Sequence, residues 1–228
     1  MLELFSGMGV MSRTFKKHGW ETFTIDWDNT LPNVDLCADV GGLSAEDIIT
    51  LCGEKPTVIW ASPDCTTYSV MSFGTHRQKV NDILYPISEY AEQCDRTNTH
   101  LIKLIEELNP KYFFIENPRG GLRKMPFMLN AMDKGLMKRY TVTYCQYGDV
   151  RQKPTDIWTN HPDPQFKPPC KPNAPCHEPA PRGTTNGTQR INGSRYRAML
   201  PIELCEHIVN ICDSSDQGKS GTKTGDRC

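Results

Sequence analysis

The sequence lacks several features that would have assigned it to a class at once. Its 228 residues contain no apolar run that approaches the length of a membrane span, and no internal repeat. A strong charge imbalance is also missing: the net charge is −1, so any surface that attracts a polyanion has to be local. A chain of this length can bury one sizeable core, and we expect one globular domain with a small appendage.

Cysteine is the residue type that the chain has in excess. Ten cysteines are scattered through segments with strand-like and helix-like patterns, and no signal peptide precedes them. This distribution predicts reduced thiols in a cytoplasmic protein rather than a disulfide scaffold.

The chain opens with a pattern typical of a strand, a turn and a helix. Residues 1–5 are predicted to form a strand, 6–10 a glycine turn and 11–18 a helix. Gly7 and Gly9 allow a ligand close to the backbone, and the helix start offers free N–H groups to an anionic group such as a carboxylate. No phosphate-loop lysine follows these glycines, which favours a nucleoside with an amino-acid tail over a triphosphate.

Two further strands are predicted to end in acids that suit the same ligand. Residues 21–26 end in Asp26, which is placed to bind ribose hydroxyls, and Trp27 follows as a stacking partner for a purine. Residues 34–40 form a third short strand that includes Asp39, which can accept a hydrogen bond from an exocyclic adenine amine. The three strand ends together predict an adenosine-like ligand.

A thiol and a carboxylate follow two other predicted strands. The buried-looking strand 56–61 leads into a turn that Pro63 bounds and that presents Cys65, while strand 111–115 ends in Glu116. Ligands bind at the carboxyl edge of open α/β sheets, so Cys65 is a candidate nucleophile and Glu116 an acid facing the same substrate. Alone, Cys65 would be interpreted as an inert, half-buried thiol.

The segment 70–78 is polar and contains glycine, with His76 and Arg77 near its end. It fits a mobile lid that touches phosphates and, equally, a solvated loop. The remaining predicted elements are helices at 44–52, 87–108, 125–137 and 201–212, a strand at 140–147, and a turn and strand at 148–158 with Arg151 and Lys153 exposed.

From residue 161 the character of the chain changes. Residues 161–196 are rich in proline and glycine. Residues 151–200 contain eight Lys and Arg and only three acidic residues. This predicts a local basic surface. Residues 213–228 are expected to form a disordered polar tail.

Cys170, Cys176 and His177, with Cys145 or His161, could be assembled into a zinc site. The C-x5-C spacing lacks the second tight pair that makes such an assignment strong, so no metal site is predicted.

The order of these motifs resembles the cytosine-C5 DNA methyltransferase family, from residue 1 to about 210. The turn from Phe5 and Ser6 through Gly9 resembles the family's first motif, which holds S-adenosylmethionine. The second and third motifs are resembled by Asp26-Trp27 and Asp39-Val40. The Pro-Cys motif is resembled by Ser62-Pro63-Asp64-Cys65 with Ser69, and the Glu-Asn-Val motif by Glu116-Asn117-Pro118. Residues 197–201 resemble the ninth motif.

The resemblance implies a fold, a reaction and roles for these residues. The fold would be a doubly wound, mostly parallel Rossmann-like α/β sheet, with a catalytic domain at 1–160, a reduced target-recognition insert at 161–196 and a helix at 197–212 that returns to the catalytic domain. Cys65 would attack C6 of a flipped cytosine while Glu116 protonates N3, and C5 would take a methyl group from S-adenosylmethionine. Cofactor-binding residues would be Phe5, Ser6, Gly7, Gly9, Asp26, Trp27, Asp39, Val40 and Pro63; substrate-binding residues would be Ser69, Arg77, Asn117, Arg151, Lys153, Arg182 and Arg190, with Arg195 as a further DNA contact.

The chain departs from the family pattern in identifiable places. Asp64 stands where the family usually has a second proline, which predicts a raised pKa for the neighbouring thiol. Residues 151–155 replace the Gln-x-Arg-x-Arg motif, and no tenth motif follows 197–201. Such compact chains resemble phage-encoded members, which places the protein in a host cytoplasm with DNA as its partner and no membrane; a monomer is one option. Two alternatives stay open: the same chemistry on RNA, and a non-catalytic protein that binds cofactor and DNA and needs a partner subunit.

Overall fold

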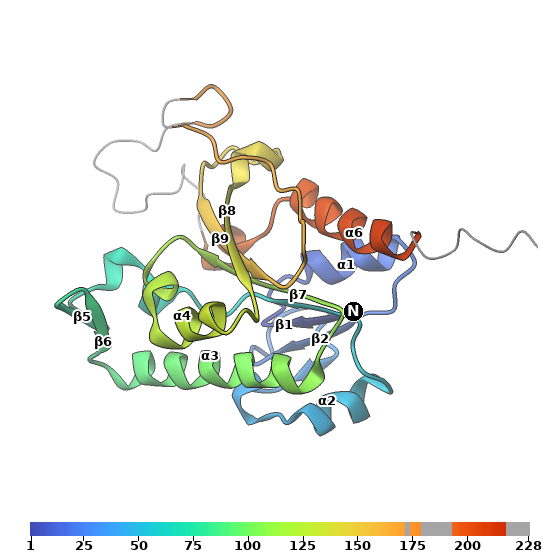
Figure 1. The fold of residues 1–228 in the computed structure, drawn as a ribbon, viewed down its shortest axis with the longest axis horizontal. Helices are drawn as coiled ribbons and strands as arrows, with labels where there is room; N and C mark the ends of the chain where they lie inside the picture. The colour runs from blue at the N-terminus through green and yellow to red at the C-terminus, as the bar shows by residue number, and fades with distance from the viewer. Residues whose placement is uncertain (172–173, 179–192, 218–228) are drawn as a thin grey trace, which may run out of the picture.

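The computed structural model describes residues 1–171, 174–178 and 193–217, and it is built around one seven-stranded sheet (Figure 1). Across the sheet the strands run in the order β3-β2-β1-β4-β7-β9-β8. Their bounds are β1 Leu2–Leu4, β2 Phe23–Asp26, β3 Leu36–Cys37, β4 Val58–Ala61, β7 Tyr112–Pro118, β8 Lys138–Thr143 and β9 Pro154–Thr159. β9 is antiparallel to both of its neighbours, and the other pairings are parallel.

The strand order reverses between β1 and β4. From β1 the chain moves outward to β2 and β3, and it then returns to place β4 and β7 on the other side of β1. At such a switch point the loops leaving the two central strands diverge, which opens a crevice at their carboxyl ends. The glycine turn after β1 and the Cys65 turn after β4 therefore lie on the two sides of one crevice, as the doubly wound fold predicts.

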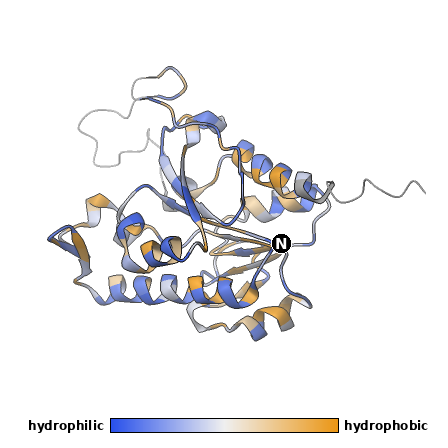
Figure 2. Cartoon of the chain, in the orientation of Figure 1, coloured by the Kyte–Doolittle hydropathy of each residue, from blue (hydrophilic) through white to orange (hydrophobic). Residues whose placement is uncertain are grey.

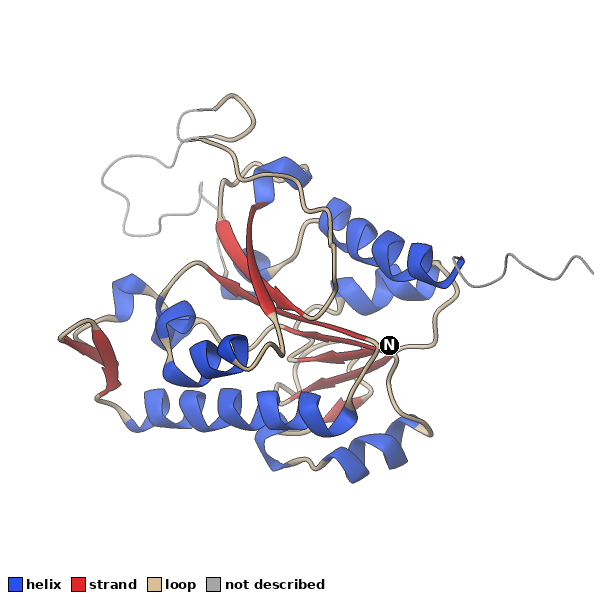
Figure 3. Cartoon of the chain, in the orientation of Figure 1, coloured by secondary structure: helices blue, strands red, loops and turns tan. Residues whose placement is uncertain are grey.

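Helices cover both faces of the sheet (Figures 1 and 3). α1 (Val10–Lys17) packs with α6 (Ile202–Gln217) on one face, while α2 (Ala45–Cys52), α3 (Glu89–Leu108) and α4 (Pro126–Asp133) lie on the other. Because helices cover both faces, the middle strands are apolar on both sides: all four residues of β4 are fully buried. The central strands are mostly hydrophobic, whereas α3 mixes hydrophilic and hydrophobic residues (Figure 2).

Local signals in the sequence fix several element boundaries. Ser44 and Asp47 form a capping box at the start of α2, and Ser88 accepts the N–H of Ala91 at the start of α3. α3 ends at Leu108, and Asn109 after it adopts the left-handed conformation that commonly stops a helix.

Other boundaries differ from the sequence-based expectation. β7 continues through Glu116 to Pro118 because β9 pairs with it along that length. The predicted strand 140–147 ends at Thr143 and continues as a 3-10 turn, η5 (Tyr144–Tyr147), and the predicted strand 34–40 shortens to β3. The segment 70–78 is not one open loop, since it includes the start of a hairpin, β5 (Arg77–Val80) with β6 (Ile83–Pro86).

The C-terminal helix is longer than predicted. α6 runs to Gln217, so residues 213–217 of the expected disordered tail are helical, and 218–228 lie outside the described residues. In the described part of the chain, no helix combines the length and the apolarity needed to cross a membrane.

Candidate active site

A cavity of about 330 Å³ occupies the crevice at the switch point. The turn after β1, the residues after β2, the turn after β4, the end of β7 and the segment before α6 all contribute to its wall. Residues from these places include Gly7, Trp27, Cys65, Glu116 and Met199, and Lys153 joins them from the residue before β9. The structure thus brings together the candidate nucleophile, the candidate acid and the glycine turn.

The glycine turn has a left-handed backbone that glycine adopts most easily. Gly7 and Gly9 have φ values of 52° and 60°, and Phe5 between the strand and the turn has a φ of 55°. The N–H of Gly7 donates to the Asp26 carboxylate at 2.8 Å, which ties the turn to the end of β2. The hydroxyl of Ser6 is buried at this wall and has no hydrogen-bond partner among the described residues.

The residues that follow β2 add an aromatic ring and an ion pair to the cavity wall. Trp27 lines the cavity with 71% of its surface exposed. Asp28 accepts a hydrogen bond from Arg195 at 2.9 Å, which joins the loop after β2 to helix α5 (Ser194–Ala198). Arg195 was expected to contact DNA, and in this structure its guanidinium is engaged by Asp28 and Thr30.

Cys65 is held by the turn that follows β4. Asn117 on the neighbouring strand β7 donates to the carbonyl of Pro63 at 2.8 Å, and Asp64 accepts the N–H of Thr66 and the hydroxyl of Tyr90. These bonds fix the backbone on both sides of Cys65. Asn117 is 1% exposed, so it positions this turn rather than contacting a substrate, which corrects its expected role.

The electrostatic environment of Cys65 disfavours the thiolate. The pKa of this thiol is raised to about 11, first by desolvation of the sulfur and then by the negative charges of Asp64 and Glu116. Lys153 opposes the rise. The raised pKa that Asp64 led us to expect is confirmed in direction, with burial as its larger cause.

Glu116 and Lys153 complete this end of the cavity. Glu116 is 5% exposed, and its Oε1 accepts the hydroxyl of Tyr144 at 2.9 Å, which orients the carboxyl group. Lys153 lies with its Nζ 4.5 Å from the centre of the Tyr144 ring and 3.1 Å from the carbonyl of Arg197. Desolvation lowers the pKa of Lys153 below its ordinary value, and the negative charge of Glu116 offsets part of this decrease.

Arg77 does not face the cavity, and its expected role with phosphates is wrong for this conformation. Its side chain is fully buried and pairs with Asp95 at 2.7 Å, and it also donates to the carbonyl of Thr67. Its guanidinium lies 4.2 Å from the centre of the Tyr68 ring. Arg77 therefore anchors the hairpin to α3.

Arg151 is also buried rather than exposed, so its expected contact with substrate is corrected. It is 4% exposed, makes a multidentate pair with Asp149, and donates to the carbonyls of Arg197 and Met199. Its function in this structure is to hold the segment before α6 against the cavity.

Three further candidates, Asp39, Val40 and Ser69, are not among the residues that line the cavity. Asp39 accepts the N–H of Gly41 and caps a short turn, and Val40 is 2% exposed in the core. Ser69 accepts the N–H of Met71. Arg182 and Arg190 lie outside the described residues.

Sequence reasoning missed several residues of the site. Tyr144, which orients Glu116, was assigned to the interior of a strand, and no local signal distinguishes it. Glu3 lies in β1, and its carboxylate accepts the N–H of Ser12 at 2.8 Å under the glycine turn. An acid inside a hydrophobic strand was the available signal.

Comparison with known proteins adds a similarity over most of the chain. No protein-family model matches the sequence. A probable DNA (cytosine-5)-methyltransferase of frog virus 3 (isolate Goorha) is 27% identical over 172 residues, which are 70% of this chain and 70% of that protein.

One solved structure, a candidate DNA modification methyltransferase encoded within a prophage of E. coli, superposes with a TM-score of 0.51 and 19% identity. The match covers 69% of this chain and 45% of that one, so the chain spans less than half of the solved protein and the likeness concerns the fold. The solved structure supports the fold alone, and it is the frog virus relative that agrees with the resemblance to the cytosine-C5 methyltransferase family predicted from the motifs.

Proposed function

We propose that the chain is an S-adenosylmethionine-dependent methyltransferase acting on C5 of cytosine in DNA. The observation that carries this proposal is one cavity whose wall contains the glycine turn together with Cys65 and Glu116, which interact electrostatically. A methyl donor held by the turn would present its reactive group to a base held by the thiol and the acid.

The turn after β1 fits an adenosyl amino acid. Gly7 and Gly9 have positive φ values, and a Cβ added at Gly9 would approach Ser12 Oγ to 3.3 Å, so a larger residue would disturb the cradle. The hydroxyl of Ser6, which has no partner among the described residues, offers a polar contact; Asp26 lines the cavity and would face the ribose, and Trp27 offers a ring for stacking. When bound, S-adenosylmethionine would supply an electrophilic methyl group.

The residues at the other end suit activation of cytosine. C5 of cytosine is a weak nucleophile until a group adds to C6, and Cys65 would make that bond as a thiolate. Glu116, oriented by Tyr144, would hydrogen-bond and protonate N3, which takes up the charge that the addition creates. Loss of the C5 proton and β-elimination after methylation would release Cys65.

Forming the thiolate is the step that this site makes difficult. With its pKa raised to about 11, Cys65 is largely protonated at neutral pH. Lys153 is the cation that opposes this cost. We assign Lys153 the role of stabilising negative charge on Cys65 and Glu116, in place of the exposed, substrate-binding role expected from sequence.

DNA is the proposed substrate because the frog virus relative carries a DNA methyltransferase name, and because residues 151–200 hold five more cations than acids. The target base would have to leave the duplex to reach Cys65. Contacts from Arg182 and Arg190 to DNA remain part of the proposal.

A mechanism-based trap tests the proposal. The protein is mixed with labelled S-adenosylmethionine and DNA or RNA in which 5-fluorocytosine replaces cytosine. A fluorine at C5 cannot leave as a proton does, so the methylated base should stay bonded to Cys65. We expect an adduct with DNA that resists denaturation, that Cys65→Ser abolishes and that Cys37→Ser retains.

The outcomes separate the alternatives. An adduct with RNA and none with DNA would replace the substrate and keep the chemistry. Absence of adduct on either nucleic acid, with cofactor binding intact, would favour the non-catalytic binding protein.

A further inference from the structure

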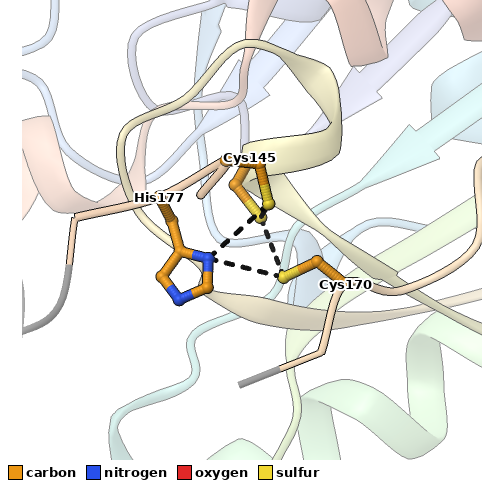
Figure 4. A group of neighbouring side chains, drawn as sticks. Cys145, Cys170 and His177 are labelled. Carbon is orange, nitrogen blue, oxygen red and sulfur yellow. Dashed lines mark hydrogen bonds between the residues drawn. The ribbon is translucent and has the colours of Figure 1, made fainter. Parts of the chain in front are cut away.

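A cluster of metal-ligand side chains lies outside the cavity, at the end of β8. Its members are Cys145, Cys170, Cys176 and His177, whose ligand atoms all lie within 4.8 Å of one another. None of the four lines the cavity of the candidate active site. Figure 4 shows Cys145, Cys170 and His177 pointing toward one another from separate backbone segments.

We propose that these four residues bind one structural Zn²⁺ ion. A tetrahedral zinc ion with Zn–S bonds of about 2.3 Å and a Zn–N bond of about 2.0 Å separates its sulfurs by about 3.8 Å and sulfur from nitrogen by about 3.6 Å. In the structure His177 Nδ1 lies 3.6 Å from Cys170 Sγ and 3.7 Å from Cys176 Sγ, and Cys176 Sγ lies 3.6 Å from Cys145 Sγ. These three separations match a zinc coordination shell, and the separation of 3.1 Å between Cys145 Sγ and Cys170 Sγ is shorter than the zinc value.

A disulfide bond, or simple packing of free thiols, accounts for the cluster less well. Cys145 Sγ and Cys170 Sγ are 3.1 Å apart, which is too far for a disulfide bond of about 2.05 Å and closer than non-bonded sulfurs normally pack. A disulfide would also use two sulfurs and leave the third thiol and the imidazole unexplained. Three thiolates with one imidazole form a common structural zinc set, and the four positions leave no ligand site open for substrate.

The surroundings of the sulfurs also suit thiolate ligands. The side-chain amides of Gln146 and Gln152 donate to Cys176 Sγ and Cys170 Sγ, both at 3.3 Å. The N–H of Cys170 donates to Thr143 Oγ1 at 2.9 Å, which fixes the backbone of one ligand. Such second-shell donors orient metal ligands and reduce the charge on sulfur.

The position of the cluster explains why a metal would be useful there. Between the end of β9 at Thr159 and the start of α5 at Ser194, the described residues contain no helix or strand. A zinc ion would join Cys145 at the end of β8 to Cys170, 25 residues later, and to the turn that carries Cys176 and His177. Metal binding would thereby fix an irregular segment that forms no core of its own.

Sequence spacing could not establish this site. The C-x5-C pair lacks a tight partner pair, and the structure supplies the missing ligands from η5 and from the residue after Cys176. His161, the other histidine considered, packs against the rings of Tyr112 and Phe114 instead.

Metal analysis of the full chain tests the proposal. Protein purified with reductant and zinc should contain one zinc per chain, and Co²⁺ substituted for it should give the visible absorption of tetrahedral thiolate coordination. Cys145→Ala and Cys170→Ala should each lower the zinc content at least fivefold, whereas Cys52→Ser, a change at a cysteine outside the cluster, should retain it. His177→Cys should keep the metal and strengthen the charge-transfer absorption of the cobalt form, because a fourth thiolate replaces the imidazole.

A second readout uses the unmodified chain, so that misfolding of a variant cannot decide the result. Zinc should protect Cys145, Cys170 and Cys176 from alkylation, and a chelator should expose all three together, as read by peptide mass spectrometry. Zinc below 0.1 per chain after refolding with excess zinc would overturn the proposal. Equal alkylation of the three cysteines with and without chelator would also overturn it. A Cys145–Cys170 disulfide that forms in protein kept with reductant and zinc would overturn it too.

Discussion

Replacing Asp64 by asparagine should lower the pKa of Cys65. Asp64 is the second-largest cause of the raised pKa, after desolvation. Asparagine removes the charge and keeps an oxygen that can accept the N–H of Thr66, while its amide group can still face the hydroxyl of Tyr90. The change therefore alters the electrostatics of the thiol with little change in the turn that holds it.

The size of the effect follows from the total shift. The pKa of Cys65 rises from 9.0 to about 11, and because burial contributes more than Asp64 we expect the variant to recover about one unit or less. One unit raises the thiolate fraction at neutral pH about tenfold. A less basic thiolate is also a weaker nucleophile, with a Brønsted coefficient of about 0.5, so the observed gain in rate should be about threefold.

Site-resolved alkylation measures this change. The rate of iodoacetamide addition to Cys65 is followed from pH 7 to pH 11 by peptide mass spectrometry, which separates Cys65 from the other thiols. Asp82→Asn, a change at an exposed carboxylate in the β5–β6 turn, is the matched control and should leave the profile unchanged. An unchanged or higher pKa of Cys65 in Asp64→Asn would refute the reasoning.

Asp64→Pro separates charge from geometry. Proline would restore the residue usual in the family, but it removes both hydrogen bonds that Asp64 accepts and restricts the residue before it. We expect Asp64→Asn to exceed the parent in adduct formation and Asp64→Pro to fall below it. A gain in Asp64→Pro at least equal to that in Asp64→Asn would mean that the aspartate is only a tolerated departure.

Three further predictions concern other charged groups. Burial raises the pKa of Glu3 from 4.5 to about 7, so the folded state binds the proton more tightly than the unfolded state does. The stability that this group contributes is full below about pH 4.5 and is lost as pH rises through 7. Glu3→Gln should remove this pH dependence of the free energy of unfolding, which urea unfolding should show as roughly 3 kcal/mol between these pH values. Arg77→Met should destabilise the fold by about 3 kcal/mol because Asp95 loses its partner, and should leave the salt dependence of DNA binding unchanged, whereas a phosphate-binding Arg77 would reduce that slope. Lys153→Met should raise the pKa of Cys65 further and slow its alkylation at pH 8; a faster reaction would contradict the role assigned to this lysine.

The sequence alone determined the order of the strands and helices of the main sheet and, to within a few residues, the ends of the strands that build the cavity. Alternation of apolar strands with capped helices predicts a doubly wound sheet, because both signals lie within a few residues of each other. Gly7, Asp26, Cys65 and Glu116 were predictable as candidate site residues for the same reason: each lies at or near the carboxyl end of a strand that the fold brings to one crevice.

Only the tertiary structure decided which charged side chains face that crevice. Arg77 pairs with Asp95, 18 residues later, and Arg151 bonds the carbonyl of Met199, 48 residues later, so neither remains available for a substrate. The cluster of Cys145 and Cys170 with Cys176 and His177 likewise depends on segments 25 or more residues apart. Local sequence encodes backbone conformation over one or two turns, whereas these contacts arise when the sheet packs distant segments together.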